Sequence, residues 1–273
     1  MNNRFTTNDL EILISTMNKT SLDFLKPMFP SSNFTDFTIL IINQTEEKNV
    51  LLSNYQNIRV INSFEKGLSK SRNLAIENAS KKIVLISDDD VVYSPNFDKT
   101  ITEAFNESTD IPIITFNHQR IGEEKPHNLS QKIFNHTLKS IERVCSIEIA
   151  FQVEKIKNNS LYFDENFGLG SYFETAEEFL FLRNAFLKQM KLIYNPSIIV
   201  SHPLLTSGDN EGDDKLIYAR AALFYKTKKQ FGYLTLLKHL YLLSSKKLLK
   251  KSEYIEKFKL GLTAIKKYKS LVK

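Results

Sequence analysis

The chain has 273 residues, of which 42% are apolar and 25% are charged, as in ordinary soluble globular proteins. It is long enough for one large domain, or for one domain with an extension. A single cysteine, Cys145, excludes an internal disulfide and a cysteine-rich zinc site, which fits a reducing compartment. The sequence shows neither a signal peptide nor the roughly 20 apolar residues of a membrane span. We therefore expect a cytoplasmic, non-spanning protein.

The formal net charge of +6 is unevenly distributed along the chain. Residues 215–273 carry 16 Lys and Arg against two acids, a balance of +14, whereas the remaining residues carry 21 basic and 29 acidic side chains, a balance of −8. The chain is thus an acidic body with a basic tail.

Strands and helices alternate over the first 90 or so residues. The hydrophobic pattern predicts strands at 10–17, 37–42, 58–61 and 83–87, a short helix at 18–29, and a second helix that Ser69 caps and that runs to Ala79. Short links between alternating strands and helices are typical of a doubly wound, mostly parallel sheet.

Three consecutive carboxylates, Asp88, Asp89 and Asp90, follow the strand at 83–87. Carboxylates this close repel one another, which favours a cation or ligand at the end of the strand, where open α/β sheets bind their ligands. The alternative is a solvated turn, because residues 93–96 are turn-like.

Two cations, Lys70 and Arg72, lie in the first turn of the helix that precedes the acidic triplet. Cations at this end oppose the helix dipole, so their placement indicates a nearby anion unless they are simply solvated.

The pattern becomes less regular after the triplet. It predicts helices at 96–105, 154–159 and 176–187, strands at 111–116 and 147–153, a long polar loop at 117–140, and apolar segments at 192–194 and 198–200 on either side of Pro196. The helix at 176–187 opens with Glu177 and Glu178, and its preceding glycine-bearing loop allows close approach of a ligand.

Helices are expected from about residue 215 to the end. Apolar residues recur there near helical spacing among many lysines, as at Ile255, Phe258, Leu262, Ile265 and Leu271. Basic amphipathic helices of this kind bind anionic membrane surfaces, although a soluble helical subdomain with a basic face has the same composition. No nucleic-acid reader motif accompanies the charges, so a nucleic-acid partner is not expected.

Four segments, in this order and spacing, resemble the motifs of one enzyme family. Residues 67–75 resemble a Gly-x-Ser-x-x-Arg-Asn segment, and residues 86–91 resemble a strand-terminal Asp-x-Asp (DXD) motif. Residues 163–168, followed by 176–178, resemble the segment that ends in a Glu-Asp pair, and His202 matches a histidine that closes the core. Together they resemble a family 2 glycosyltransferase of the bacterial cell-surface polysaccharide type, over residues 10–203.

The resemblance implies an α/β fold of the GT-A type, with a Rossmann-like, mostly parallel central sheet flanked by helices and a basic helical extension at the C-terminus. We expect the glycosyltransferase domain to span residues 1–210 and the extension to span residues 211–273.

By the same resemblance, the protein is a hexosyltransferase-type enzyme that transfers a sugar, with inversion, from a nucleoside diphosphate sugar to a glycan or lipid-linked acceptor. The expected donor is a UDP-sugar, the expected cofactor is Mn²⁺ or Mg²⁺, and the expected location is the inner face of the cell membrane, as a peripheral protein. Such a donor site needs oxygen ligands for a partly hydrated cation and a general base for the acceptor hydroxyl.

The resemblance also assigns roles to individual residues. Glu178 is the expected base, with Glu177 in support. The expected metal ligands are Asp90, Asp88 and His202, and the residues expected to contact the nucleotide-sugar are Ser15, Thr16, Asn43, Lys70, Arg72, Asp88 and Asp89.

Two positions depart from the family pattern. Asn43 and Gln44 stand where an acidic residue usually reads the base, and Glu178 stands where aspartate is usual, which moves the carboxylate by one methylene. Two other functions remain open on the sequence. One is a non-catalytic glycan-binding or scaffolding relative of the fold, and the other is a nucleotidyltransferase, although residues 15–18 lack the glycine-rich loop that such enzymes carry.

Overall fold

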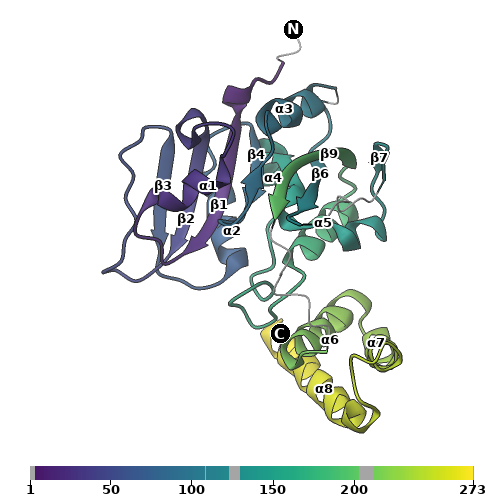
Figure 1. Ribbon diagram of the computed structural model, residues 1–273. Coiled ribbons are helices and arrows are strands. Elements are labelled where there is room, and N and C mark those ends of the chain that lie inside the picture. Colours follow the sequence, from purple (N-terminus) through teal and green to yellow (C-terminus); the bar gives the residue numbers. More distant parts are fainter. Residues whose placement is uncertain (1–3, 108, 123–129, 203–211, 273) are drawn as a thin grey trace. The chain divides into compact units, whose positions relative to one another are not determined.

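Figure 1 shows the computed structural model of the protein, which describes residues 4–107, 109–122, 130–202 and 212–272. The chain divides into two compact units. Unit 1 comprises residues 1–164 and 178–204, and unit 2 comprises residues 165–177 and 205–273. The predicted domain boundary at residues 210 and 211 lies outside the described residues and stays a prediction.

The strands belong to one sheet in unit 1. They are β1 (Leu10–Met17), β2 (Thr38–Gln44), β3 (Ile58–Ser63), β4 (Ile83–Ser87), β5 (Val92–Tyr93), β6 (Ile113–Arg120), β7 (Phe134–Asn135), β8 (Ile149–Gln152) and β9 (Leu192–His202). Their order is β3-β2-β1-β4-β8-β6-β9-β5, with β7 paired to β9. Strands β3, β2, β1 and β4 are mutually parallel, β9 is parallel to β6, and β8, β5 and β7 run antiparallel to their neighbours.

The longer helices flank this sheet or form unit 2. The helices that flank the sheet are α1 (Leu25–Met28), α2 (Leu68–Asn78), α3 (Phe97–Glu107), α4 (Val153–Asn158) and α5 (Glu177–Leu187). The helices of unit 2 are α6 (Asp214–Lys228), α7 (Phe231–Ser245) and α8 (Tyr254–Leu271). A mixed, mostly parallel sheet between helices confirms the predicted fold class.

Both faces of the sheet are buried, which explains why its central strands lack polar alternation. In β1, Leu10, Ile12 and Ile14 point into a core shared with α1 and α3, whereas Leu13 points into a second core shared with α2, α4 and α5. The continuous apolar run of β4 divides in the same way between the two cores. The sheet therefore lies between two helical layers.

The structure corrects the predicted end of the sheet. Residues 192–202 form one strand, β9, that passes through Pro196 instead of breaking there, and the register with β6 shifts between Thr115 and His118. This irregularity accommodates a proline, which cannot donate a ladder hydrogen bond. Strand β6 likewise continues to Arg120, so the first residues of the predicted loop at 117–140 belong to the sheet.

Two local predictions near the N-terminus were also wrong in detail. The predicted helix at 18–29 is reduced to a 3₁₀ turn, Leu22–Phe24, and the single-turn α1. Gly67, with φ of 130°, is the N-cap of α2, and Ser69 lies buried inside the helix. That φ value is in the region that favours glycine, so the backbone of Gly67 sets the start of α2.

In unit 2, small residues let the three helices pack closely. A Cβ placed on Gly232 of α7 would lie 2.7 Å from backbone atoms of Tyr225 in α6, and one placed on Gly261 of α8 would lie 2.5 Å from a methyl group of Leu236 in α7. The inward residues Ala264, Ile265 and Tyr268 of α8 are buried. Within the described residues, none of the helices has the length and apolar character needed to cross a membrane.

Candidate active site

Polar residues gather where parallel strands end at one edge of unit 1. Ser15 and Thr16 end β1, Asn43 and Gln44 end β2, and Asp88 follows β4. Because β1, β2 and β4 are adjacent and parallel, these ends share one edge of the sheet (Figure 1). That is the edge at which open α/β sheets bind ligands.

Asp88 is paired with a deeply buried arginine. The guanidinium of Arg72, only 1% exposed, lies 3.0 Å from Asp88 Oδ1 and 5.5 Å from the centre of the Phe163 ring. The second oxygen of Asp88 accepts a hydrogen bond of 3.4 Å from the hydroxyl of Ser146. Of the two alternatives for the cations at the start of α2, Arg72 follows the one with a nearby anion, and Asp88 is that anion.

Asp89 turns in a different direction. Its Oδ2 accepts a 2.5 Å hydrogen bond from the hydroxyl of Thr16 and lies 3.0 Å from Lys19 Nζ. The buried amide of Asn43 holds the backbone of Lys19 from both sides, accepting from its N–H and donating to its carbonyl at 3.0 Å each. Asn43 thus fixes the segment that carries the cation facing Asp89.

Asp90 is the most exposed of the three, with 55% of its side chain accessible, and it meets His202. Strand β5 begins at Val92 and pairs with Ser201 of β9, which brings the end of β9 back to the triplet. His202 Nε2 lies 3.4 Å from Asp90 Oδ1, and this hydrogen bond holds the pKa of the Asp90 carboxyl below its usual value, against the opposing effect of partial burial.

The three carboxylates therefore point to three different partners: Arg72, Lys19 and His202. The expectation that their mutual repulsion is relieved mainly by a bound cation is incomplete, because Arg72 and Lys19 already offset the charges of Asp88 and Asp89. Beneath them, the hydroxyl of Tyr93 donates to Ser87 Oγ at 2.6 Å and closes the loop that carries the triplet.

Helix α2 is tied to the same edge by two polar contacts. The hydroxyl of Ser71 donates to Ser15 Oγ at 2.9 Å, and the backbone N–H of Gly67 donates to Gln44 Oε1 at 2.7 Å. Lys70 points outward and forms an ion pair of 2.5 Å with Glu65. Ser15 therefore helps to position α2, whereas Lys70 lies on its exposed side.

Glu177 and Glu178 begin α5, as the sequence predicted. Glu177 is buried at 7% exposure, and Glu178 is partly exposed. Further along α5, Phe181, Leu182 and Ala185 lie in the second core and anchor the helix against the sheet.

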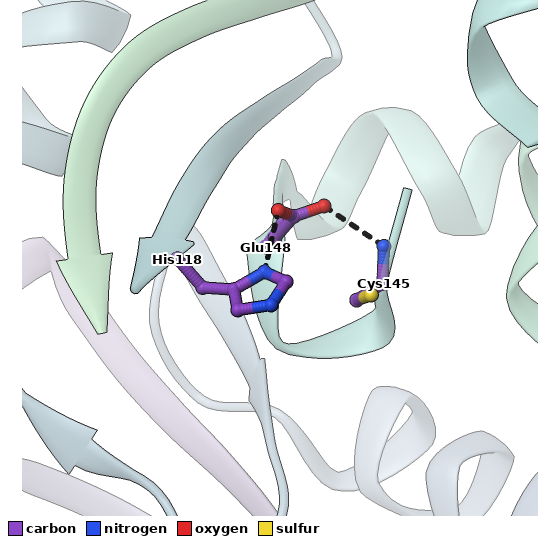
Figure 2. A group of neighbouring side chains, drawn as sticks. All are labelled: His118, Cys145 and Glu148. Carbon is purple, nitrogen blue, oxygen red and sulfur yellow. Dashed lines mark hydrogen bonds and ion pairs between the residues drawn. The ribbon is translucent and has the colours of Figure 1, made fainter. Parts of the chain in front are cut away.

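A hydrogen-bonded cluster of His118, Cys145 and Glu148 lies between β6 and a 3₁₀ turn, as Figure 2 shows. The carboxylate of Glu148, 1% exposed, accepts from His118 Nδ1 and from the backbone N–H of Cys145, at 2.8 Å each. Since Glu148 fixes the Nδ1 proton, the Nε2 atom of His118 is the acceptor of the neutral ring.

The thiol of Cys145 connects this cluster to the candidate site. Burial raises the pKa of the thiol, and the negative charges of Glu148, Glu178 and Asp88 raise it further, while Arg120 opposes them. The base expected from the sequence and the first residue of the triplet thus act on the same thiol. The fold brings α5 and the end of β4 to one region of unit 1.

Comparison with known proteins shows the family to which the chain belongs. The model of glycosyl transferase family 2 matches residues 9–171, which is more than half of the chain. The chain belongs to glycosyltransferase family 2. No curated protein sequence matches the chain.

Solved structures of S. aureus TarS share the fold of this family 2 glycosyltransferase. The crystal structure of TarS residues 1–349 has a TM-score of 0.58 and 16% identity over 94% of this chain and 80% of that chain. The same fragment in complex with UDP-GlcNAc has a TM-score of 0.59 and 16% identity over 94% and 81%. Its complex with UDP has a TM-score of 0.58 and 16% identity over 94% and 80%. At this identity the similarity shows the fold alone.

Two groups of side chains have nitrogen, oxygen or sulfur atoms that are suitable as metal ligands. Among the described residues, the group whose ligand atoms all lie within 4.8 Å of one another is His118, Cys145 and Glu148. Its nitrogen, sulfur and oxygen atoms suit zinc, but two of them already share a hydrogen bond. Asp90 and His202 offer an exposed oxygen and a nitrogen, which suits a partly hydrated Mg²⁺ or Mn²⁺ better.

Sequence reasoning missed two residues that hold this edge together: Lys19 and Ser146. Lys19 could have been predicted, because it is a cation that closely follows β1, and the acidic triplet follows the neighbouring strand β4. Ser146 had none, since its contact with Asp88 joins residues 58 positions apart in the chain. The predicted roles of all site residues in catalysis and binding stay predictions.

Proposed function

We propose that the protein is an inverting, metal-dependent glycosyltransferase that moves a hexose from a UDP-sugar to a glycan or lipid-linked acceptor in surface polysaccharide synthesis. The observation that carries the proposal is the acidic triplet at the carboxyl edge of the sheet. Its carboxylates contact separate partners, Arg72, Lys19 and His202, and Asp90 is 55% exposed.

The donor would lie along the ends of β1, β2 and β4. Thr16 and Lys19 line this edge beside Asp89, and the buried Asn43 and Ser15 keep the strand ends in place. The crystallised complexes of TarS with UDP-GlcNAc and UDP support a UDP-sugar as the donor. Lys70 could reach the diphosphate by leaving its exposed pair with Glu65, because a surface ion pair is weak.

Asp90 and His202 would hold Mn²⁺ or Mg²⁺, with the diphosphate and water as further ligands. The cation would supply Lewis-acid stabilisation of the charge that develops on the departing diphosphate. Asp88 is committed to Arg72 and Ser146, so it orients the loop and contributes negative charge beside the ion.

Glu178 is the proposed general base. The acceptor hydroxyl oxygen forms a bond to the anomeric carbon while the bond from that carbon to the diphosphate oxygen breaks, and the hydroxyl proton passes to the Glu178 carboxylate. A single in-line displacement of this kind inverts the anomeric centre. Base catalysis contributes roughly 100- to 10,000-fold to such a step. Glu177, buried at the first position of α5, supports the helix start.

The basic helices of the chain support a lipid-linked acceptor. Residues 215–273 carry a charge of +14, which favours association with an anionic membrane surface as a peripheral protein.

The first test is thermal stabilisation of the purified protein by a panel of nucleoside diphosphates with and without Mn²⁺. A ligand at about 100 times its dissociation constant stabilises by roughly 2.7 kcal/mol, which is visible as a rise in Tm. We expect a Mn²⁺-dependent rise with UDP. The variant Asp90→Asn should lose the Mn²⁺ dependence, whereas Asp98→Asn should keep it, because Asp98 lies near the amino ends of β1 and β2.

Transfer assays with UDP-sugars then test the base. Glu178→Gln should lower kcat by roughly 100-fold or more with little change in nucleotide binding, and Glu103→Gln, an exposed carboxylate of α3, serves as the matched control. Full activity of both Asp90→Asn and Glu178→Gln would contradict the mechanism. Nucleotide binding without transfer to any acceptor would instead favour a non-catalytic relative.

A further inference from the structure

Helix α7 has two apolar faces, and only one of them is covered within unit 2. Its inward positions, spaced three or four apart, are Gly232, Leu236, Leu240 and Leu243, all buried. This face contacts α6 and α8, with backbone atoms of Tyr225 beside Gly232.

The opposite side of α7 is exposed and mostly apolar, with Lys238 in its middle. Phe231 is 72% exposed, Leu234 62%, Tyr241 66% and Leu242 44%. Their spacing of 3, 7 and 1 residues keeps them on one side of a helix with 3.6 residues per turn. The first turn of α8 adjoins this side, because the hydroxyl of Tyr254 donates to the carbonyl of Leu237. A helix that is hydrophobic all round is normally buried, so the outward face of α7 needs a covering surface.

Cations surround this outward face, and the chain has no acid nearby in sequence. Residues 215–252 contain ten Lys and Arg and no Asp or Glu. The exposed lysines at the two ends and the middle of α7 are Lys228, Lys229, Lys238, Lys246, Lys247, Lys250 and Lys251. A second copy of the same surface would bring these charges together, so self-association through this face is opposed by repulsion.

We propose that the outward face of α7, defined by Phe231, Leu234, Tyr241 and Leu242, lies in the interface of an anionic lipid bilayer. Lys238 within the face and the lysines at its two ends reach the headgroups through their long side chains, Tyr241 has the apolar ring and polar tip that suit this boundary, and the helix lies parallel to the membrane plane. The inference deepens the membrane part of the proposed function. It moves the contact from α8, where Ile265 is buried, to α7.

The absence of tryptophan from the sequence gives a direct test. Phe231→Trp introduces a single probe on α7, and Leu52→Trp introduces one at an equally exposed position of unit 1, where Leu52 is 75% exposed. Vesicles of phosphatidylcholine with phosphatidylglycerol should shift the emission of the Phe231→Trp protein to the blue, and brominated lipid should quench it. The Leu52→Trp protein should show neither effect.

Vesicle flotation measures the affinity. Phe231→Ser combined with Tyr241→Ser should lower the partition coefficient for anionic vesicles at least tenfold, and Lys246→Gln with Lys247→Gln should also lower it. Leu52→Ser combined with Phe64→Ser, two exposed residues of unit 1, should change nothing. Circular dichroism spectra and Tm values equal to those of the parent protein show that each variant is folded.

Three outcomes would overturn the proposal. If the α7 variants bind as the parent does, α7 is not the contact. If the parent does not bind anionic vesicles, or binds neutral ones as well, the assignment of an anionic membrane as the partner is wrong. If light scattering shows a concentration-dependent dimer that Phe231→Ser abolishes, the partner is a second copy. None of these readouts depends on sugar transfer, so the membrane proposal can be contradicted while the proposed glycosyltransferase reaction stands.

Discussion

His136 is expected to make the folded protein sensitive to mild acid. It is 6% exposed, its Nε2 lies 2.7 Å from Thr115 Oγ1, and its Nδ1 lies 2.9 Å from Ser140 Oγ. The rings of Phe134 and Tyr194 complete its surroundings. A neutral imidazole satisfies both hydroxyls, since one ring nitrogen donates and the other accepts.

Burial lowers the pKa of His136 from 6.5 to about 4. A pKa shift of about 2.5 units, at about 1.36 kcal/mol per unit, corresponds to a change of about 3 kcal/mol in the free energy of unfolding. Because the pKa of His136 is lower in the folded protein, the unfolded chain binds a proton at this ring more readily between about pH 4 and about pH 6.5. The free energy of unfolding therefore keeps its full value above about pH 6.5 and falls as the pH drops toward about 4. Between about pH 7.5 and about pH 5 the expected loss is about 2 kcal/mol.

Urea unfolding of the parent protein and of His136→Gln at these two pH values isolates the effect. Glutamine retains a hydrogen-bonding amide but does not titrate, so the parent should lose about 2 kcal/mol more than the variant between about pH 7.5 and about pH 5. An equal loss in both proteins would refute the reasoning. So would an NMR titration of the folded protein in which the His136 ring protonates near its usual pKa.

Three further predictions concern packing and reactivity. Gly232→Ala should destabilise unit 2 by about 1–3 kcal/mol in urea unfolding, because its Cβ would meet helix backbone, whereas Gly261→Ala should cost less because its nearest neighbour is a movable leucine methyl. Asn73→Ala should cost about 2–4 kcal/mol, since its amide pairs with both the N–H and the carbonyl of buried Phe163, and an unchanged unfolding midpoint would contradict this. Cys145, whose thiol pKa is raised mainly by burial, should react with iodoacetamide far more slowly in the native protein than in urea, and equal rates would show an accessible thiolate.

The central strands were predictable because they are buried on both faces. Strand β1 at Leu10–Met17 and β4 at Ile83–Ser87 agree with the sequence to the residue. Strands β2, β6 and β9 extend further than predicted, to Gln44, Arg120 and His202. Polar residues at their ends join the ladder through backbone hydrogen bonds, and those bonds depend on the neighbouring strand instead of on side-chain hydropathy.

The edge that carries the candidate site was also predictable, but its internal contacts were not. The sequence placed Asp88, Asp89 and Asp90 after a buried strand and offered a nearby anion as one of two explanations for Arg72. The pairing of Asp90 with His202 required β5 to fold back on β9, and that of Asp89 with Lys19 required Asn43 to hold the intervening segment. Such contacts join residues far apart in sequence, so they cannot be predicted from local sequence patterns.

The sequence by itself determined the alternation of strands and helices, the acidic strand end and the basic charge of the C-terminal helices, because these follow from residue type and spacing. Only the tertiary structure decided which apolar residues of those helices are covered. Leu236 is buried where Gly261 lets α8 approach α7, and Ile265 of α8 is buried as well, while Phe231 and Tyr241 are left in solvent. Hydrophobicity gives each residue a preference for burial, but the faces that meet are set by the shape of the partners.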